Sequence, residues 1–445
     1  MHRSAFLAWI AGALLWAAGS AHAILPIQHW QTASGARVYF VENHDLPMFD
    51  LSIEFPAGAG FDSPEKSGVA SMTNRLLRRG VEAMDEDEIA RRLANVGAQL
   101  GARFGIDSAG LALRSLSSAT EREQGLDVFA RILAAPQFPQ SVLEREKVRL
   151  IASLKEADTK PDTIASRMFY RLVYRDHPYA MRAAGEPETV KRISRQDLVD
   201  FYRSHYTARH AVVALIGDLT RDQAAAIAER ITSSLPSAER PDFVLPPVPE
   251  LRAGTTRDIP HAATQAHILI GAPGMRRDDP DYFPLFVGNY ILGGGGFVSR
   301  LNEEVRQKRG LAYSAYSYFS PLRQQGPFVI GMQTQREQAG LALKVVRATL
   351  RDFLEKGPSE KELTAAKQNI IGGFPLRIDS NRKIHEYLGL IGFYGLPLTY
   401  LEDFIKNVER VTVAEVQDAF ARRIDPERLV TVVVGPASSH SQAAQ

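Results

Sequence analysis

Alternation of apolar and polar residues predicts strands near the start of two similar stretches of the chain. Residues 38–43 (VYFVEN) and 49–58 (FDLSIEFPAG) alternate as the two strands of a hairpin, and residues 68–77 then follow a helical pattern. The same order returns later, with a strand over residues 266–274 and a helix over residues 282–292. The pattern therefore predicts two related halves.

Both stretches also close in the same way. Residues 211–218 (AVVALIGD) and 429–436 (LVTVVVGP) are continuous apolar runs that reach a glycine, which is typical of a buried strand. Long amphipathic helices are predicted in the middle of each half, over residues 88–96, 121–133, 141–156, 338–355 and 359–371. Strands and helices that do not strictly alternate favour an α+β fold, and the repeat after about two hundred residues indicates an internal duplication.

A proline-rich segment separates the halves. Residues 234–251 contain five prolines, a density that excludes helix and central strand and predicts an extended linker. The halves then become an N-terminal domain over residues 24–233 and a C-terminal domain over residues 252–437. Residues 438–445 are small and polar, and we expect a disordered tail there.

The N-terminus has the pattern of a secretion signal. Arg3 supplies a positive charge, residues 5–16 are almost unbroken apolar, and the small residues of Ala21-His22-Ala23 suit a signal peptidase. The apolar run is shorter than the roughly twenty residues that span a bilayer, so a retained anchor is the less favoured alternative. Residues 1–23 therefore predict export, with a bacterial periplasm as the first choice.

The composition limits the kinds of metal site and partner that can be expected. The chain has no cysteine, which excludes disulfides and thiolate metal sites, so any metal would need His, Asp or Glu ligands. The formal net charge is +2, with 53 basic and 51 acidic residues interspersed. This balance indicates neither a nucleic acid nor an anionic membrane as a partner.

A glycine run marks the most informative stretch. It consists of Gly293, Gly294, Gly295 and Gly296. Phe297, Leu301 and Val305 follow at intervals of four, which predicts one apolar face of a helix opened by the run. Glycine allows close approach of a backbone or a substrate, so a substrate-binding role is predicted, with a flexible helix start as the alternative.

The end of this helix leads into a strand. Arg306 lies at the helix end, Gly310 is a stop signal, and the alternating LAYSAYSYF reads as a strand. A tight turn would therefore bring Arg306 and Tyr313 together. The simplest interpretation is that Arg306 caps the helix and Tyr313 packs in the strand.

This stretch resembles the C-terminal half of insulinase/pitrilysin-type zinc peptidases, the inverzincins. The resemblance rests on an Arg followed seven residues later by a Tyr, with Gly-Leu between them and a glycine-rich helix upstream, and it extends over nearly all of the mature chain. It implies two homologous α+β lobes that form a clam-like half-shell. It also implies catalytic roles for Arg306 and Tyr313, which would support the scissile peptide from the side opposite the metal.

The zinc half of the family's site is not matched. Active members carry His-x-x-Glu-His on the first-half helix, where the histidines hold zinc and the Glu is the base. Alignment by the flanking residues places SMTNR there, with Ser71 and Arg75 at the histidine positions and Asn74 at the Glu position. The third ligand falls on Ala152 or Ser153, so the resemblance implies no metal on this chain.

No other site compensates for this loss. Glu156 lies near the third-ligand position but points away on a helix, and His385-Glu386 lacks the second histidine of the other zincin motif. No nucleophile elbow or Walker-type phosphate loop occurs. The family's substrate-strand signature, residues 97–102, has Gly101 where Asn is usual.

The resemblance implies the non-zinc subunit of a split enzyme, because some bacterial and mitochondrial members are heterodimers with one zinc-bearing chain. We therefore expect a homologous partner that carries Zn²⁺, and unfolded peptides as substrates. Two alternatives stay open: a catalytically inert peptide-binding or structural protein of the same fold, and a self-sufficient hydrolase with an unrecognised site.

Overall fold

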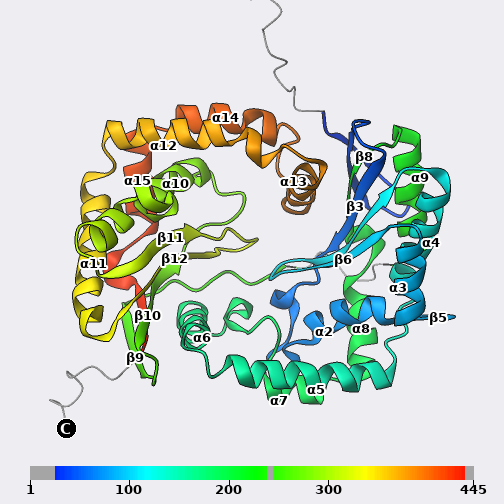
Figure 1. The fold of residues 1–445 in the computed structure, drawn as a ribbon, viewed down its shortest axis with the longest axis horizontal. Coiled ribbons are helices and arrows are strands. Elements are labelled where there is room, and N and C mark those ends of the chain that lie inside the picture. The colour runs from blue at the N-terminus through cyan, green and yellow to red at the C-terminus, as the bar shows by residue number, and fades with distance from the viewer. Residues whose placement is uncertain (1–25, 238–243, 436–445) are drawn as a thin grey trace, which may run out of the picture.

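The computed structural model describes residues 26–237 and 244–435. The predicted signal peptide, the predicted tail and the centre of the predicted linker lie outside these residues. The fold is α+β, as predicted, with two lobes that form an open half-shell (Figure 1). No helix in the described ranges is long and apolar enough to cross a bilayer.

The first lobe is built on a six-stranded sheet of order β1-β2-β8-β3-β7-β6. Its strands are β1 (Gln28–Gln31), β2 (Arg37–Glu42), β3 (Met48–Phe55), β6 (Gln99–Phe104), β7 (Ala109–Leu116) and β8 (Val212–Gly217). The predicted hairpin of β2 and β3 is wrong, because β8 lies between them, parallel to β2 and antiparallel to β3. Every residue of β8 is buried, and a strand without a polar face belongs at the centre of a sheet.

The second sheet repeats this arrangement with five strands, in the order β11-β12-β10-β13-β9. They are β9 (Thr255–Pro260), β10 (Gln265–Pro273), β11 (Ala312–Phe319), β12 (Pro327–Gln335) and β13 (Val430–Gly435). Strand β13 is parallel to β9 and antiparallel to β10, as β8 is to β2 and β3. The shared order supports the predicted duplication, and it gives β6 and β11 equivalent places as edge strands.

Helices flank the sheets, and a short ribbon of β4 (Gly80–Val81) and β5 (Met84–Asp85) follows the first of them. In the first half they are α2 (Val69–Leu76), α3 (Glu86–Asn95), α4 (Ala119–Ala134), α5 (Gln140–Ala157), α6 (Pro161–Tyr174), α7 (Pro187–Arg192), α8 (Arg195–His205) and α9 (Arg221–Thr232). In the second half they are α10 (Tyr282–Asn289), α11 (Ala339–Lys356), α12 (Glu360–Gly373), α13 (Asn381–Tyr394), α14 (Tyr400–Arg410) and α15 (Val413–Arg423).

One helix from each half packs on the sheet of the other. Helix α6 of the first half packs against β10 and β13, and α13 of the second half packs against β8 and β3 (Figure 1). Glycines make both contacts close: a Cβ on Gly271 would come within 2.9 Å of the Phe169 ring, and one on Gly392 within 2.6 Å of Val212. The exchange joins the lobes through a shared apolar core.

A buried carboxylate also joins the halves. Asp107 accepts hydrogen bonds from the Tyr179 hydroxyl (2.6 Å), the Tyr394 hydroxyl (2.9 Å) and the Arg323 backbone N–H (2.7 Å). Asp107 and Tyr179 belong to the first half, and the other two belong to the second. Burial raises the pKa of both tyrosines, and the nearby Asp107 raises it further.

Candidate functional site

The helix that carries Arg306 begins after the glycine run. The run ends a helical segment over Tyr290–Gly294, and a separate turn over Gly296–Val298 precedes the next helix at Arg300. Leu301 and Val305 are buried as predicted, but Phe297 is 65% exposed, so its assignment to the buried face is wrong. The reason is local: Ser299 is extended, with φ of −81° and ψ of 151°, which breaks the helical repeat between Phe297 and Leu301.

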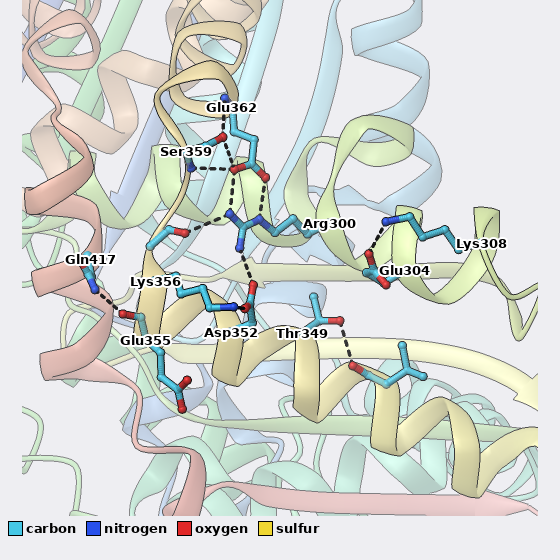
Figure 2. Close-up of polar contacts among 12 residues, drawn as sticks. Arg300, Glu304, Lys308, Thr349, Asp352, Glu355, Lys356, Ser359, Glu362 and Gln417 are labelled. Carbon is cyan, nitrogen blue, oxygen red and sulfur yellow. Dashed lines mark hydrogen bonds and ion pairs between the residues drawn. The ribbon is translucent and has the colours of Figure 1, made fainter.

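Arg300 anchors the start of this helix (Figure 2). Its Nε and Nη2 atoms donate to the Glu362 carboxylate at 2.6 and 2.8 Å, and Nη1 lies 3.3 Å from Asp352. Although burial raises the pKa of Glu362, hydrogen bonds from Arg300 and Ser359 lower it to about 2. This charge-assisted network holds the helix against α11 and α12.

The helix ends at the glycine that the sequence indicated. Gly310 has a φ of 60°, its N–H donates to the carbonyl of Arg306, and the N–H of Leu311 donates to the carbonyl of Val305, both at 2.9 Å. The bond of Gly310 is that of an αL cap, in which a left-handed glycine satisfies one of the last helical carbonyls and reverses the chain. Strand β11 begins directly afterwards, at Ala312.

The turn brings Arg306 and Tyr313 together. The Arg306 Cζ atom lies 4.8 Å from the centre of the Tyr313 ring and 4.6 Å from that of Phe297, so the guanidinium is held between two aromatic rings. Tyr313 sits at a bulge between β11 and β12 and is 81% exposed, which is not the packed position of the simplest interpretation. Phe297 was not predicted to join this stack, because its spacing assigned it to the buried face of the helix.

Arg306 has free donors. In residues 26–237 and 244–435 its guanidinium makes no hydrogen bond and no ion pair, and stacking leaves the edge of the plane accessible. An arginine presents five N–H donors in a fixed plane. The arrangement can therefore donate hydrogen bonds to a carbonyl or an oxyanion beside the Tyr313 hydroxyl.

The glycine run serves the protein's own packing. A Cβ on Gly293 would lie 2.4 Å from the backbone nitrogen of Ser317 on β11, so this residue is glycine because a strand lies against it. A Cβ on Gly294 or Gly295 would lie 2.7 Å from an atom of the preceding turn, whereas Gly296 faces open space. Contact of the run with a substrate stays a prediction.

The remnant of the zinc motif lies on α2, in the other lobe. Asp62 accepts hydrogen bonds from the N–H groups of Gly68 (2.6 Å) and Ala70 (2.9 Å) and so caps the helix, while burial raises its pKa to about 7. Asn74 is only 2% exposed and donates to the carbonyl of Gly110 (3.0 Å) and the hydroxyl of Tyr206 (3.4 Å). Asn74 is therefore a structural residue here.

These side chains do not fit zinc. Ser71 offers a hydroxyl, the Asn74 amide is engaged, and Arg75 brings a positive charge, whereas zinc takes imidazole, thiolate and carboxylate ligands. Within the described part of the chain, no group of three or more His, Asp or Glu side chains could hold a metal ion.

The neighbouring helix α5 does not supply the third ligand. Ala152 and Ser153 are exposed, and Glu156 points into solvent, where it pairs with Lys160 at 3.0 Å. The carboxylate that faces α2 is the buried Glu146, one of whose oxygens lies 3.4 Å from Arg75. Sequence reasoning missed Glu146, because nothing in its local pattern marks it.

The two predicted groups are not in contact. Strand β11 and helix α2 belong to different lobes (Figure 1), and among the described residues no hydrogen bond or ion pair joins Arg306 or Tyr313 to Ser71, Asn74 or Arg75.

Comparisons with known proteins agree with this geometry. Residues 37–186 match the family model described as insulinase (peptidase family M16), and residues 192–370 match the one described as peptidase M16 inactive domain. The chain is 26% identical over 408 residues to the "non-peptidase homolog YmxG" of Helicobacter pylori, over 89% of this chain and 91% of that one.

Solved structures share the fold. A peptidase M16 inactive domain from Pseudomonas fluorescens is 38% identical, with a TM-score of 0.89 over 93% of this chain and 98% of that one. The periplasmic protease PqqL from Escherichia coli is 15% identical, with a TM-score of 0.79 over 93% of this chain but only 46% of its own. The chain therefore belongs to the insulinase (M16) peptidase family, as a member that lacks the zinc motif.

Proposed function

We propose that this chain is the metal-free subunit of a heterodimeric zinc endopeptidase that cleaves unfolded peptides in the periplasm. It would supply Arg306 and Tyr313 to a site whose zinc is on a homologous partner chain. The observation that carries the proposal is the contrast between the two lobes: α2 cannot hold zinc, yet the Arg306–Tyr313 pair is exposed and free to donate.

The role of the pair follows from its donors. Zinc on the partner would activate a water, and the guanidinium of Arg306 and the hydroxyl of Tyr313 would donate hydrogen bonds to the substrate carbonyl and its developing oxyanion. A donor placed where charge develops contributes about 2.7–4 kcal/mol. Phe297 keeps the guanidinium plane in place, so little reorganisation is needed when substrate binds.

The solved relatives support the pairing and the compartment. Less than half of the periplasmic protease PqqL is matched by this chain, as expected if that protease contains two half-shells in one polypeptide. Two separate chains would then supply the same two halves. A periplasmic location is also what the predicted signal at residues 1–23 would provide.

The test is to mix this protein with its zinc-bearing homologue and to measure zinc content and peptidase activity of each chain alone and of the mixture. We expect no zinc and no activity in this chain alone, and strong activity on mixing. Tyr313→Phe should lower kcat of the mixture well over tenfold without affecting assembly. Tyr316→Phe, on the same strand, is the matched control and should keep activity.

Two results would overturn the proposal: stoichiometric zinc in the isolated chain, or full activity of Tyr313→Phe. The name of the Helicobacter pylori relative, a non-peptidase homolog, favours the alternative of an inert peptide-binding protein. Peptide binding without cleavage, both alone and in the mixture, would support that alternative.

A further inference from the structure

A dense cluster of arginines lies on α2, on the turn Leu77–Arg79 that follows it and on α5, where Arg75 and Glu146 join the two helices. We call it the arginine face, and it comprises Arg75, Arg78, Arg79, Arg145 and Arg149, together with Glu86 and Glu146. Five guanidinium groups against two carboxylates leave three uncompensated positive charges. The chain as a whole is nearly neutral, so this surface is a local exception.

Both carboxylates are already shared between arginines. Glu146 accepts from Arg149 at 3.1 Å and pairs with Arg75 at 3.4 Å. Glu86 accepts from Arg79 at 2.8 Å and from Arg145 at 2.6 Å. Neither carboxylate reaches Arg78.

Arg78 has no anionic partner. Among the described residues it makes no hydrogen bond or ion pair, and its Nε atom is buried without an acceptor. Burial lowers the pKa of Arg78, and the like charges of Arg79 and Arg75 lower it further. A half-buried guanidinium beside two others is electrostatically unfavourable, and a bound anion would relieve this.

The position of the arginine face indicates what kind of anion it binds. Arg78 lies in the turn over Leu77–Arg79 that directly follows α2. Helix α2 itself packs against β6, the edge strand of the first sheet, which pairs with β7 on one side only. An open edge can accept an extended peptide by backbone hydrogen bonds. A peptide on β6 would lie beside α2, and the planar guanidinium groups match a carboxylate in geometry and charge.

We propose that the arginine face binds a carboxylate of an extended peptide, with Arg78 as the principal donor. The carboxylate comes from an Asp or Glu side chain or from the peptide's C-terminus. This inference deepens the proposed function by naming acidic peptides as the ligand class. Its test needs no catalysis, so it can fail or succeed independently of the zinc-bearing partner.

The experiment measures binding of fluorescently labelled peptides to the isolated protein by anisotropy, at low and high salt. One peptide carries Glu at two positions and its match carries Gln there, each with a free or an amidated C-terminus. We expect the acidic peptide to bind roughly tenfold more tightly than its match, with the preference weakened by salt. Comparison of the free and amidated forms shows whether the bound carboxylate is the C-terminus or a Glu side chain.

The variant Arg78→Gln should abolish the preference without lowering the thermal stability, since Arg78 has no partner to lose. Arg351→Gln is the matched control, because Arg351 is an exposed arginine of the second lobe, paired with Glu427. Equal affinity for the two peptides, or an unchanged preference in Arg78→Gln, would overturn the proposal. Inorganic phosphate that binds as tightly as the acidic peptide would also overturn it, in favour of a phosphate site.

Discussion

Protonation of one buried histidine should weaken the contact between the lobes. His385 lies on α13 and is 3% exposed at the surface of the first sheet. Its Nδ1 accepts from Arg103 Nη2 at 3.1 Å, so its Nε2 must carry the proton that is donated to the carbonyl of Ala214, at 3.2 Å. Only the neutral ring makes both bonds. Burial, together with the nearby Arg103 and Arg114, lowers its pKa to about 4, against a smaller opposing effect of Asp50.

The sign and size of this pH effect on stability follow from the difference between the pKa of His385 in the folded and in the unfolded chain. The unfolded chain binds this proton as the pH falls below about 6.5, whereas the folded protein resists it until about pH 4. The free energy of unfolding is therefore unaffected by His385 above about pH 6.5 and decreases as the pH falls. The difference between the two pKa values corresponds to about 3 kcal/mol at full protonation, of which about 2 kcal/mol is lost between pH 7 and pH 5.

Urea unfolding of the wild type and of His385→Gln at these two pH values measures the effect. The glutamine amide can donate and accept but does not titrate, so the difference between the two proteins removes the contribution of all other groups. We expect the wild type to lose about 2 kcal/mol more than the variant between pH 7 and pH 5. The same loss in both proteins would refute the reasoning.

Two further substitutions test the packing. Asp107→Ala should lower the free energy of unfolding by about 3–5 kcal/mol, because the buried Tyr179 hydroxyl and two half-buried donors lose their acceptor. Asp127→Ala, which removes surface ion pairs, should change it by less than about 1 kcal/mol. A loss below about 1 kcal/mol for Asp107→Ala would contradict its role between the halves. Gly293→Ala should destabilise by about 1–3 kcal/mol, because its Cβ would meet β11, whereas Gly340→Ala in α11 meets nothing and should be neutral or stabilising. Thermal unfolding measures the stability of both glycine variants. If Gly293→Ala were as stable as the wild type, β11 could not lie as close to Gly293 as the structure shows.

The hydrophobic pattern along the chain was enough to predict features that depend only on residues close together in the sequence. Periodicity located the helix α5 and the strand β13 to within a residue at each end. Gly310 marked the end of a helix, because a left-handed cap is a local requirement, and the spacing of Arg306 and Tyr313 across that turn was enough to bring them together.

Long-range packing was decided only in the folded molecule. The place of β8 between β2 and β3 and the exchange of α6 and α13 depend on which apolar surfaces meet across the chain. The same holds for the approach of Glu146 to Arg75, which are far apart in sequence.

The sequence by itself therefore determined the six strands β2, β3, β8, β10, β11 and β13, the helix end at Gly310, the Arg306–Tyr313 pair and the loss of the zinc ligands. The tertiary structure decided the order of the strands, the exposure of Phe297 and the isolation of Arg78 among like charges. The physical reason is that caps and periodicity act between neighbours in the chain, whereas burial and charge depend on everything that packs around a residue.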